Sequence, residues 1–137
     1  EIEESAYMST DVCLPAIGQG AIAIECRADN AETIAMLKSI NDAATETAIV
    51  AERSYMKTIG GGCKFPLGAY ATVANGEVNL HVMLGNHHTG QIIRMDETGS
   101  VADAEKLGQK LGEAMIAEAE KQGIDFRSPL NPPLGDL

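Results

Sequence analysis

The dipeptide Asn75-Gly76 constrains the fold of this chain more than any other feature of the sequence. It separates two runs of alternating apolar and polar residues, LGAYATVA (67–74) and EVNLHVMLG (77–85). Asn-Gly tolerates the left-handed backbone that a two-residue hairpin loop needs, so the two runs are predicted to pair as antiparallel strands. A third run, QIIRMDET (91–98), follows the turn NHHTG and is predicted to extend the sheet to three antiparallel strands.

Two predicted helices flank this sheet. The first runs from Asp42 to about Ile59, where glycines end it. The second opens at Ser100, with Asp103 three residues later as in a capping box. Each carries an apolar stripe at helical spacing, made of Ala44, Ala48, Ala51, Tyr55 and Ile59 in the first helix and of Ala104, Leu107, Leu111, Met115 and Ala119 in the second. The order α-β-β-β-α predicts an α+β domain, with a small three-stranded antiparallel sheet and helices packed on one face.

The first 41 residues have a different pattern. Residues 14–27, LPAIGQGAIAIECR, begin with turn residues and then alternate, which predicts a strand. A short helix capped by Asp29 or Asn30 is predicted to follow. We therefore divide the chain into residues 1–41, which look like a different unit or a strand and helix borrowed from one, and residues 42–137, the α+β domain. The chain starts at Glu1 with a polar stretch, and we expect it to be part of a longer protein.

Charge and cysteine content exclude several classes of function. The formal net charge is -10, from 10 Lys and Arg against 20 Asp and Glu, so nucleic acid and anionic membranes would be repelled. No stretch approaches the roughly 20 apolar residues that span a bilayer. Three cysteines without a Cys-x-x-Cys pair fit neither a zinc site nor a disulfide framework. We expect a cytoplasmic protein with no metal, no nucleic-acid partner and no membrane partner.

Three smaller motifs have simple structural interpretations. Gly18-Gln19-Gly20 opens a loose G-x-G-x-x-A pattern, but a dinucleotide site needs a strand before the glycines and a helix after them. A tight turn is favoured instead, from which the Gln19 amide could still face a ligand. His87-His88 is expected in a solvated hairpin loop. Glu52-Arg53 is expected to form a surface or inter-helix ion pair.

The segment IGGGCKFPLG (59–68) contains the strongest candidate site residue, Cys63. A free cysteine is usually a small buried hydrophobe. Here three glycines follow one another, and each costs up to about 1 kcal/mol relative to alanine in regular structure. One glycine would be enough to end the helix, so the others need a different reason, such as room for bare backbone. Pro66 stiffens the turn that follows. Because the negative end of the preceding helix disfavours a thiolate, the loop favours an anchoring thiol over a nucleophile in repeated turnover.

Several of these motifs occur together, and in this order, in one family. They are P-A-x-G-Q-G and I-E-C-R within residues 14–27, A-E-R at residues 51–53, and G-G-C-x-x-P-x-G-x-Y at residues 61–70. From about Leu14 to Ala119 the chain resembles the C-terminal part of hydroxymethylbilane synthase, also called porphobilinogen deaminase. The resemblance implies a transferase that condenses porphobilinogen, with loss of ammonia, into a linear tetrapyrrole.

The same resemblance implies roles for particular residues. Cys63 would carry a dipyrromethane cofactor through a thioether, with Gly61 and Gly62 leaving room for it. Gln19 and Gly20 would lie near the pyrrole chain, and Arg27 would contact either ligand or a neighbouring lobe.

The resemblance further implies that part of the enzyme lies upstream of this chain. The family has three domains, and residues 1–41 would be the strand, helix and hinge that return from the upstream lobes, a strand-helix segment of a missing α/β lobe. The catalytic aspartate and most carboxylate-binding arginines belong to the upstream sequence. We therefore expect no catalytic residue here. We also expect an inactive fragment with unmodified Cys63 that could self-associate, and a monomeric full-length enzyme.

Two alternatives remain open from the residues alone. The order α-β-β-β-α also occurs in double-stranded-RNA-binding modules, although the negative charge opposes that function. A structural or regulatory domain with a buried Cys63 is the other alternative. Slow labelling of the thiol under native conditions would favour it.

Overall fold

The computed structural model describes residues 8–60, 66–86, 89–124 and 126, and its elements follow the predicted order. They are α1 (Ala31–Lys38), α2 (Ala43–Ile59), β1 (Leu67–Ala74), β2 (Glu77–Gly85), β3 (Ile92–Ser100), the 3-10 turn η2 (Val101–Asp103) and α3 (Ala104–Lys121). From α2 onward this is an α+β domain with a three-stranded sheet, as predicted.

The sheet has the strand order β1-β2-β3, and both pairs are antiparallel. Asn75 (φ 53°) and Gly76 (φ 79°) both adopt the left-handed backbone, which confirms the hairpin. Its register pairs Ala74 with Glu77 and continues to Leu67 and Leu84. The third strand ends two residues later than predicted, because Ser100 still pairs with Glu77.

Side chains at the helix ends explain where the helices begin and stop. Asp42 caps α2 by accepting the Thr45 N–H at 2.7 Å, and Gly60 ends it with a left-handed φ of 76°. Asn30 caps α1 in the same way. Ser100 caps the turn η2, and α3 begins only after Asp103, which makes no side-chain cap. The predicted helix start at Ser100 therefore corresponds to a 3-10 turn that leads into α3.

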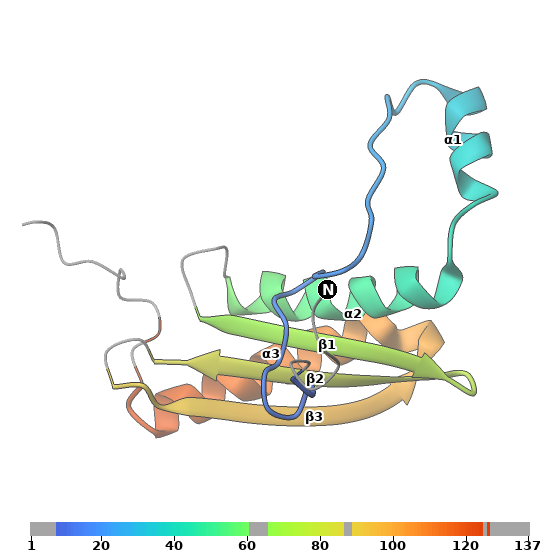
Figure 1. Cartoon of the computed structure of the whole chain (residues 1–137). Helices are drawn as coiled ribbons and strands as arrows, with labels where there is room; N and C mark the ends of the chain where they lie inside the picture. The colour runs from blue at the N-terminus through green and yellow to red at the C-terminus, as the bar shows by residue number, and fades with distance from the viewer. Residues whose placement is uncertain (1–7, 61–65, 87–88, 125, 127–137) are drawn as a thin grey trace, which may run out of the picture.

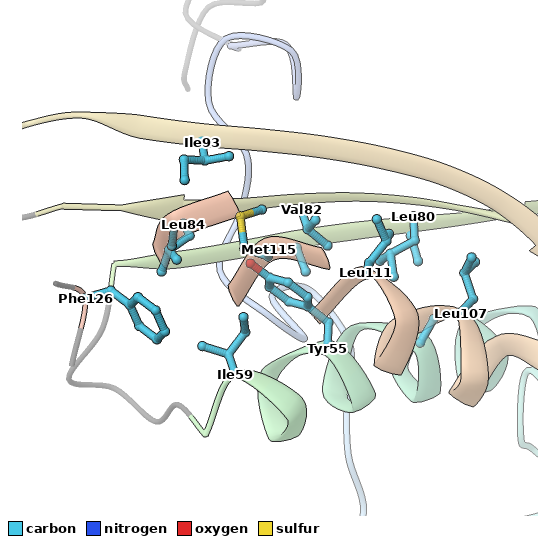
Figure 2. Packing of buried hydrophobic residues seen from close by; sticks show 14 of the residues in the cluster. Tyr55, Ile59, Leu80, Val82, Leu84, Ile93, Leu107, Leu111, Met115 and Phe126 are labelled. Atoms are coloured by element: carbon cyan, nitrogen blue, oxygen red, sulfur yellow. The ribbon is translucent and has the colours of Figure 1, made fainter. Parts of the chain in front are cut away.

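The core lies between the sheet and the two long helices, which cover one face of it (Figures 1 and 2). Its largest fully buried side chains are Tyr55, Leu80, Leu84, Met115, Val78 and Val82. The predicted stripe of α3 is buried throughout, and so is that of α2 from Ala51 onward. Ala44 is exposed, contrary to the prediction, because it belongs to the first turn of α2, where no other described element covers it.

The segment before α1 does not form the predicted strand. Residues 21–27 have no strand structure, and the side chain of Ile22 is 93% exposed. Alternation predicts a strand only where another strand supplies hydrogen bonds, and none among the described residues does so here. The preceding residues cross the outer face and the β1 edge of the sheet (Figure 1). Arg94 donates to the carbonyls of Asp11 and Val12, and the Ala69 N–H donates to the carbonyl of Pro15 at 3.3 Å.

Candidate functional site

The loop that contains Cys63 connects α2 to β1. Residues 61–65, including Cys63, lie outside the described residues, but both flanks are defined. Gly60 closes α2 through a backbone hydrogen bond to the Lys57 carbonyl. On the other side, the Pro66 carbonyl accepts the Gly85 N–H at 2.8 Å, so the chain is bound to β2 just before β1 begins. The two flanks of the loop are therefore the C-terminal end of a helix and the start of a sheet strand.

Gly18, Gln19 and Gly20 form the tight turn predicted from the sequence. Gly18 and Gly20 have φ angles of 73° and 89°, which favour glycine. The Gln19 N–H donates to the Ala16 carbonyl, and the Ala16 N–H donates to Gln19 Oε1, both at 3.0 Å. This exchange occupies the amide oxygen. In the part of the chain that the structure describes, Gln19 Nε2 and the Gly20 N–H have no hydrogen-bond partner, and both residues are exposed.

Glu52 differs most from its prediction. It forms no ion pair with Arg53 but is buried, with 5% of its surface exposed. Its Oε2 accepts the Gly18 N–H at 2.7 Å, and its Oε1 accepts the Ala71 N–H at 2.9 Å. Burial raises the pKa of Glu52, while the two N–H donors act in the opposite direction. A carboxylate buried on α2 thus links the glycine turn to the edge of the sheet.

The position of Glu52 in the helix was a signal that sequence reasoning missed. Residue 52 lies four residues after Ala48 and three before Tyr55, so it belongs to the apolar side of the predicted helix. An acid at such a position requires partners, because an unpaired buried carboxylate is strongly unfavourable. Here the partners are backbone amides, which a residue pattern does not reveal.

The described arginines do not surround the glycine turn. Arg27 makes two hydrogen bonds to Asp29, and this exposed pair raises the pKa of Arg27. Arg94 is bound to backbone carbonyls on the outer face of the sheet. Arg53 is exposed on α2. Within the described ranges there is thus no cluster of guanidinium groups suited to a ligand with several carboxylates.

The remaining features concern the histidine pair, metal binding, membrane segments and pockets. His87 and His88 lie outside the described residues, and the residues that the structure describes contain no group of His, Cys, Asp and Glu able to hold a metal ion. No described helix is long and apolar enough to cross a bilayer. A shallow pocket between α1 and the start of α2 contains none of the predicted site residues. It is lined by Cys26, Ile34, Leu37, Lys38, Asn41 and Glu46.

Comparison with known proteins agrees with the motifs. Residues 46–117 match the family model described as porphobilinogen deaminase, C-terminal domain. The chain belongs to the porphobilinogen deaminase family. Residues 1–35 match a second model of this family, described as its dipyromethane cofactor binding domain, and this match includes Gln19 and Gly20. The RNA-binding alternative depended on the element order α-β-β-β-α. Membership of this family accounts for that order.

Two curated relatives show how much of the family this chain represents. A porphobilinogen deaminase of Brevibacillus brevis is 45% identical over 119 residues, which cover 86% of this chain and 38% of the relative. A porphobilinogen deaminase of Halalkalibacterium halodurans is 38% identical over 120 residues, which cover 87% of this chain and 38% of the relative. The chain thus spans about two fifths of the length of these relatives.

Proposed function

We propose that this chain is the C-terminal part of an enzyme that condenses porphobilinogen units, with loss of ammonia, into a linear tetrapyrrole. The observation that carries the proposal is the pair of family matches, which cover residues 1–35 and 46–117 in the order of the family's own domains. The relatives' name supports the same activity. We place the enzyme in the cytoplasm, as a monomer, with porphobilinogen and the growing pyrrole chain as its ligands.

In this proposal Cys63 holds the dipyrromethane cofactor through a thioether. The bound group would supply the pyrrole end to which new units are joined. The defined flanks of its loop suit a tether, because an anchored ligand needs a fixed origin. The loop of Cys63 lies outside the described residues. The mass-spectrometry test below therefore also decides whether Cys63 is instead buried in a structural role.

Gln19 and Gly20 are proposed to face the pyrrole chain. Gln19 Nε2 and the Gly20 N–H are donors with no partner in the described part of the chain, and donors suit the carboxylates of a pyrrole ligand. A Cβ at Gly20 would have no heavy atom within 4 Å among the described residues, so a flat ligand could approach this backbone. The residues therefore fit the group in their donor chemistry.

The chain does not supply the charges that such a ligand needs. The formal net charge is -10, and the described arginines lie away from the turn or are already paired. Bidentate arginine forks are the natural partners of carboxylates. We therefore propose that the catalytic aspartate and the binding arginines come from the remainder of the enzyme, and that residues 1–137 alone are inactive, with Cys63 unmodified.

Intact mass spectrometry tests the tether. In a full-length enzyme that contains this chain, Cys63→Ser should remove the dipyrrole adduct. Cys26→Ser should keep it, because Cys26 is exposed on another segment and has no run of glycines beside it. An adduct that persists in the Cys63→Ser protein would refute the assignment. Residues 1–137 alone should carry no adduct and form no bilane. Either product would disprove the proposal that the catalytic aspartate and the binding arginines come from the remainder of the enzyme.

A further inference from the structure

Glu52 is a buried acid that the packing of the core does not require. Its neighbours on the inner side of α2, Ala48, Ala51 and Tyr55, are the small and aromatic residues of an ordinary apolar stripe. A buried carboxylate is tolerated when both of its oxygens are hydrogen-bonded, as they are here. What this acid contributes is the hydrogen bond that it accepts from the Gly18 N–H.

The segment before Gly18 has a second attachment on the same strand. The Pro15 carbonyl accepts from the Ala69 N–H, and Glu52 Oε1 accepts from the Ala71 N–H two residues along the edge of β1. Glu52 Oε2 then holds Gly18, three residues after Pro15. The segment is thus attached at Pro15 and again at Gly18, directly before Gln19 and Gly20.

The elements that hold the turn are also the elements that flank the Cys63 loop. Glu52 belongs to α2, which ends at Ile59, and Ala69 and Ala71 belong to β1, which begins at Leu67. The turn is therefore attached to the same two elements that the Cys63 loop connects.

We propose that Glu52 is a positioning residue that locks the segment from Pro15 to Gly18 to α2 and β1, so that Gln19 and Gly20, which follow directly, keep a fixed place relative to a carboxylate-bearing pyrrole ligand. This inference rests on the proposed function. Its physical core, the clamp made by one carboxylate on two backbone amides, is independent of any ligand.

Only a glutamate fulfils this geometry. Glutamine offers one oxygen, and its NH2 group would face one of the two N–H donors. Aspartate is shorter by one C–C bond, about 1.5 Å, and would not reach both amides. Glu52→Gln therefore preserves the shape of the side chain while removing one acceptor.

The clamp is tested by amide hydrogen exchange in residues 1–137. Glu52→Gln should speed exchange at Gly18 or Ala71 by about 10-fold, because one hydrogen bond is lost. The control Glu120→Gln makes the same change of charge on the exposed side of α3 and should leave both amides unchanged. If the exchange rates of Gly18 and of Ala71 are the same in the Glu52→Gln chain as in the parent, the clamp is overturned.

A measurement on the parent chain keeps the clamp testable if the variant does not fold. The amide signals of Gly18 and Ala71 should move with pH at one common midpoint, since both donate to the same carboxyl group. Two separate midpoints, or no movement at either amide, would overturn the clamp.

The positioning role is tested in a full-length enzyme that contains this chain. Glu52→Gln should keep the adduct at Cys63 but lower kcat/KM at least about 10-fold, since small misplacements of binding groups are costly. Tyr55→Phe is the matched control, because it removes a hydrogen bond from α2 without touching the turn. It should change kcat/KM less than about 2-fold, whereas a merely structural role for Glu52 predicts similar losses in both variants.

The possible failures are distinguishable. Faster exchange at Gly18 together with unchanged kcat/KM would overturn the positioning role and leave the proposed function intact. A parent enzyme without an adduct at Cys63 would overturn the proposed function, and the ligand-positioning role with it, although the clamp would stand on the exchange data.

Discussion

The hydroxyl of Tyr55 is the buried polar group that joins α2 to the middle of the sheet. The side chain is fully buried, and its hydroxyl donates to the Met83 carbonyl at 3.1 Å. Burial raises the pKa of Tyr55 far above its ordinary value, so the group remains a neutral donor. One hydrogen bond thus orients the largest ring of the core (Figure 2).

Tyr55→Phe should lower the free energy of unfolding by about 1 kcal/mol, since the ring still fills the core while the hydrogen bond is lost. Denaturant unfolding measures this change. Tyr70→Phe, whose hydroxyl has no partner in the described part of the chain, should change stability by less than about 0.5 kcal/mol. Equal losses in the two variants would show that the Tyr55 hydroxyl contributes nothing specific.

Glu52 makes the stability depend on pH in a defined direction. Because its pKa is raised in the folded chain, the folded state keeps a proton that the unfolded state has already released. The free energy of unfolding of the parent, relative to Glu52→Gln, should therefore fall as pH rises from the ordinary glutamate pKa to the raised one. Unfolding measured across this range checks the sign, and a relative stability that increases with pH would contradict it.

At the scale of elements, α2 and α3 approach each other closely through glycines. A Cβ added at Gly108 would lie 2.2 Å from the Ala51 carbonyl oxygen, and one at Gly112 would lie 2.6 Å from Thr58 Cβ. Neither contact is possible without moving a helix. These two glycines set the separation of the helices that cover the sheet, a function that their sequence spacing alone did not reveal.

Gly108→Ala should lower the free energy of unfolding by about 1 to 3 kcal/mol, because the methyl group meets backbone atoms. Helix propensity acting alone predicts the opposite sign, a gain of about 1 kcal/mol. Thermal or denaturant unfolding thus decides between the two by sign. Unchanged or increased stability would indicate that α2 and α3 can separate freely.

At the scale of the whole molecule, the segment around α1 stands apart from the sheet and its two helices (Figure 1). Several of its large apolar side chains are solvent-exposed: Ile22 93%, Ile24 60%, Met36 64% and Ile40 69%. So many exposed large apolar side chains in one short segment are unusual on an isolated soluble domain. The exposure of these side chains is consistent with the predicted division at residue 41. The division itself remains a prediction.

Residues 1–137 alone should therefore associate in a concentration-dependent way. The double variant Ile22→Ser and Ile24→Ser should weaken this association in sedimentation experiments without lowering the free energy of unfolding, because both side chains lie outside the core. Ile93→Ser, at a buried position, is the control that should unfold the domain. A parent chain that stays monomeric at high concentration would disprove the prediction.

Local patterns were sufficient for most of the fold and for the choice of candidate residues. The bounds of β1 and β2, the turn at Asn75-Gly76 and the caps at Asp42 and Gly60 depend on the conformations of neighbouring residues, so a short stretch of residues is enough to predict them. The motifs likewise located the glycine turn and indicated the family, although the role of Cys63 stays a prediction.

Long-range packing, in contrast, fixed features that no local pattern showed. It buried Glu52, which became an acceptor for two distant amides instead of a partner for Arg53. It also left residues 21–27 without strand structure although they alternate. Both results depend on partners far away in the chain, because hydrogen bonds across a fold are set by which backbones meet and not by the residues in one segment.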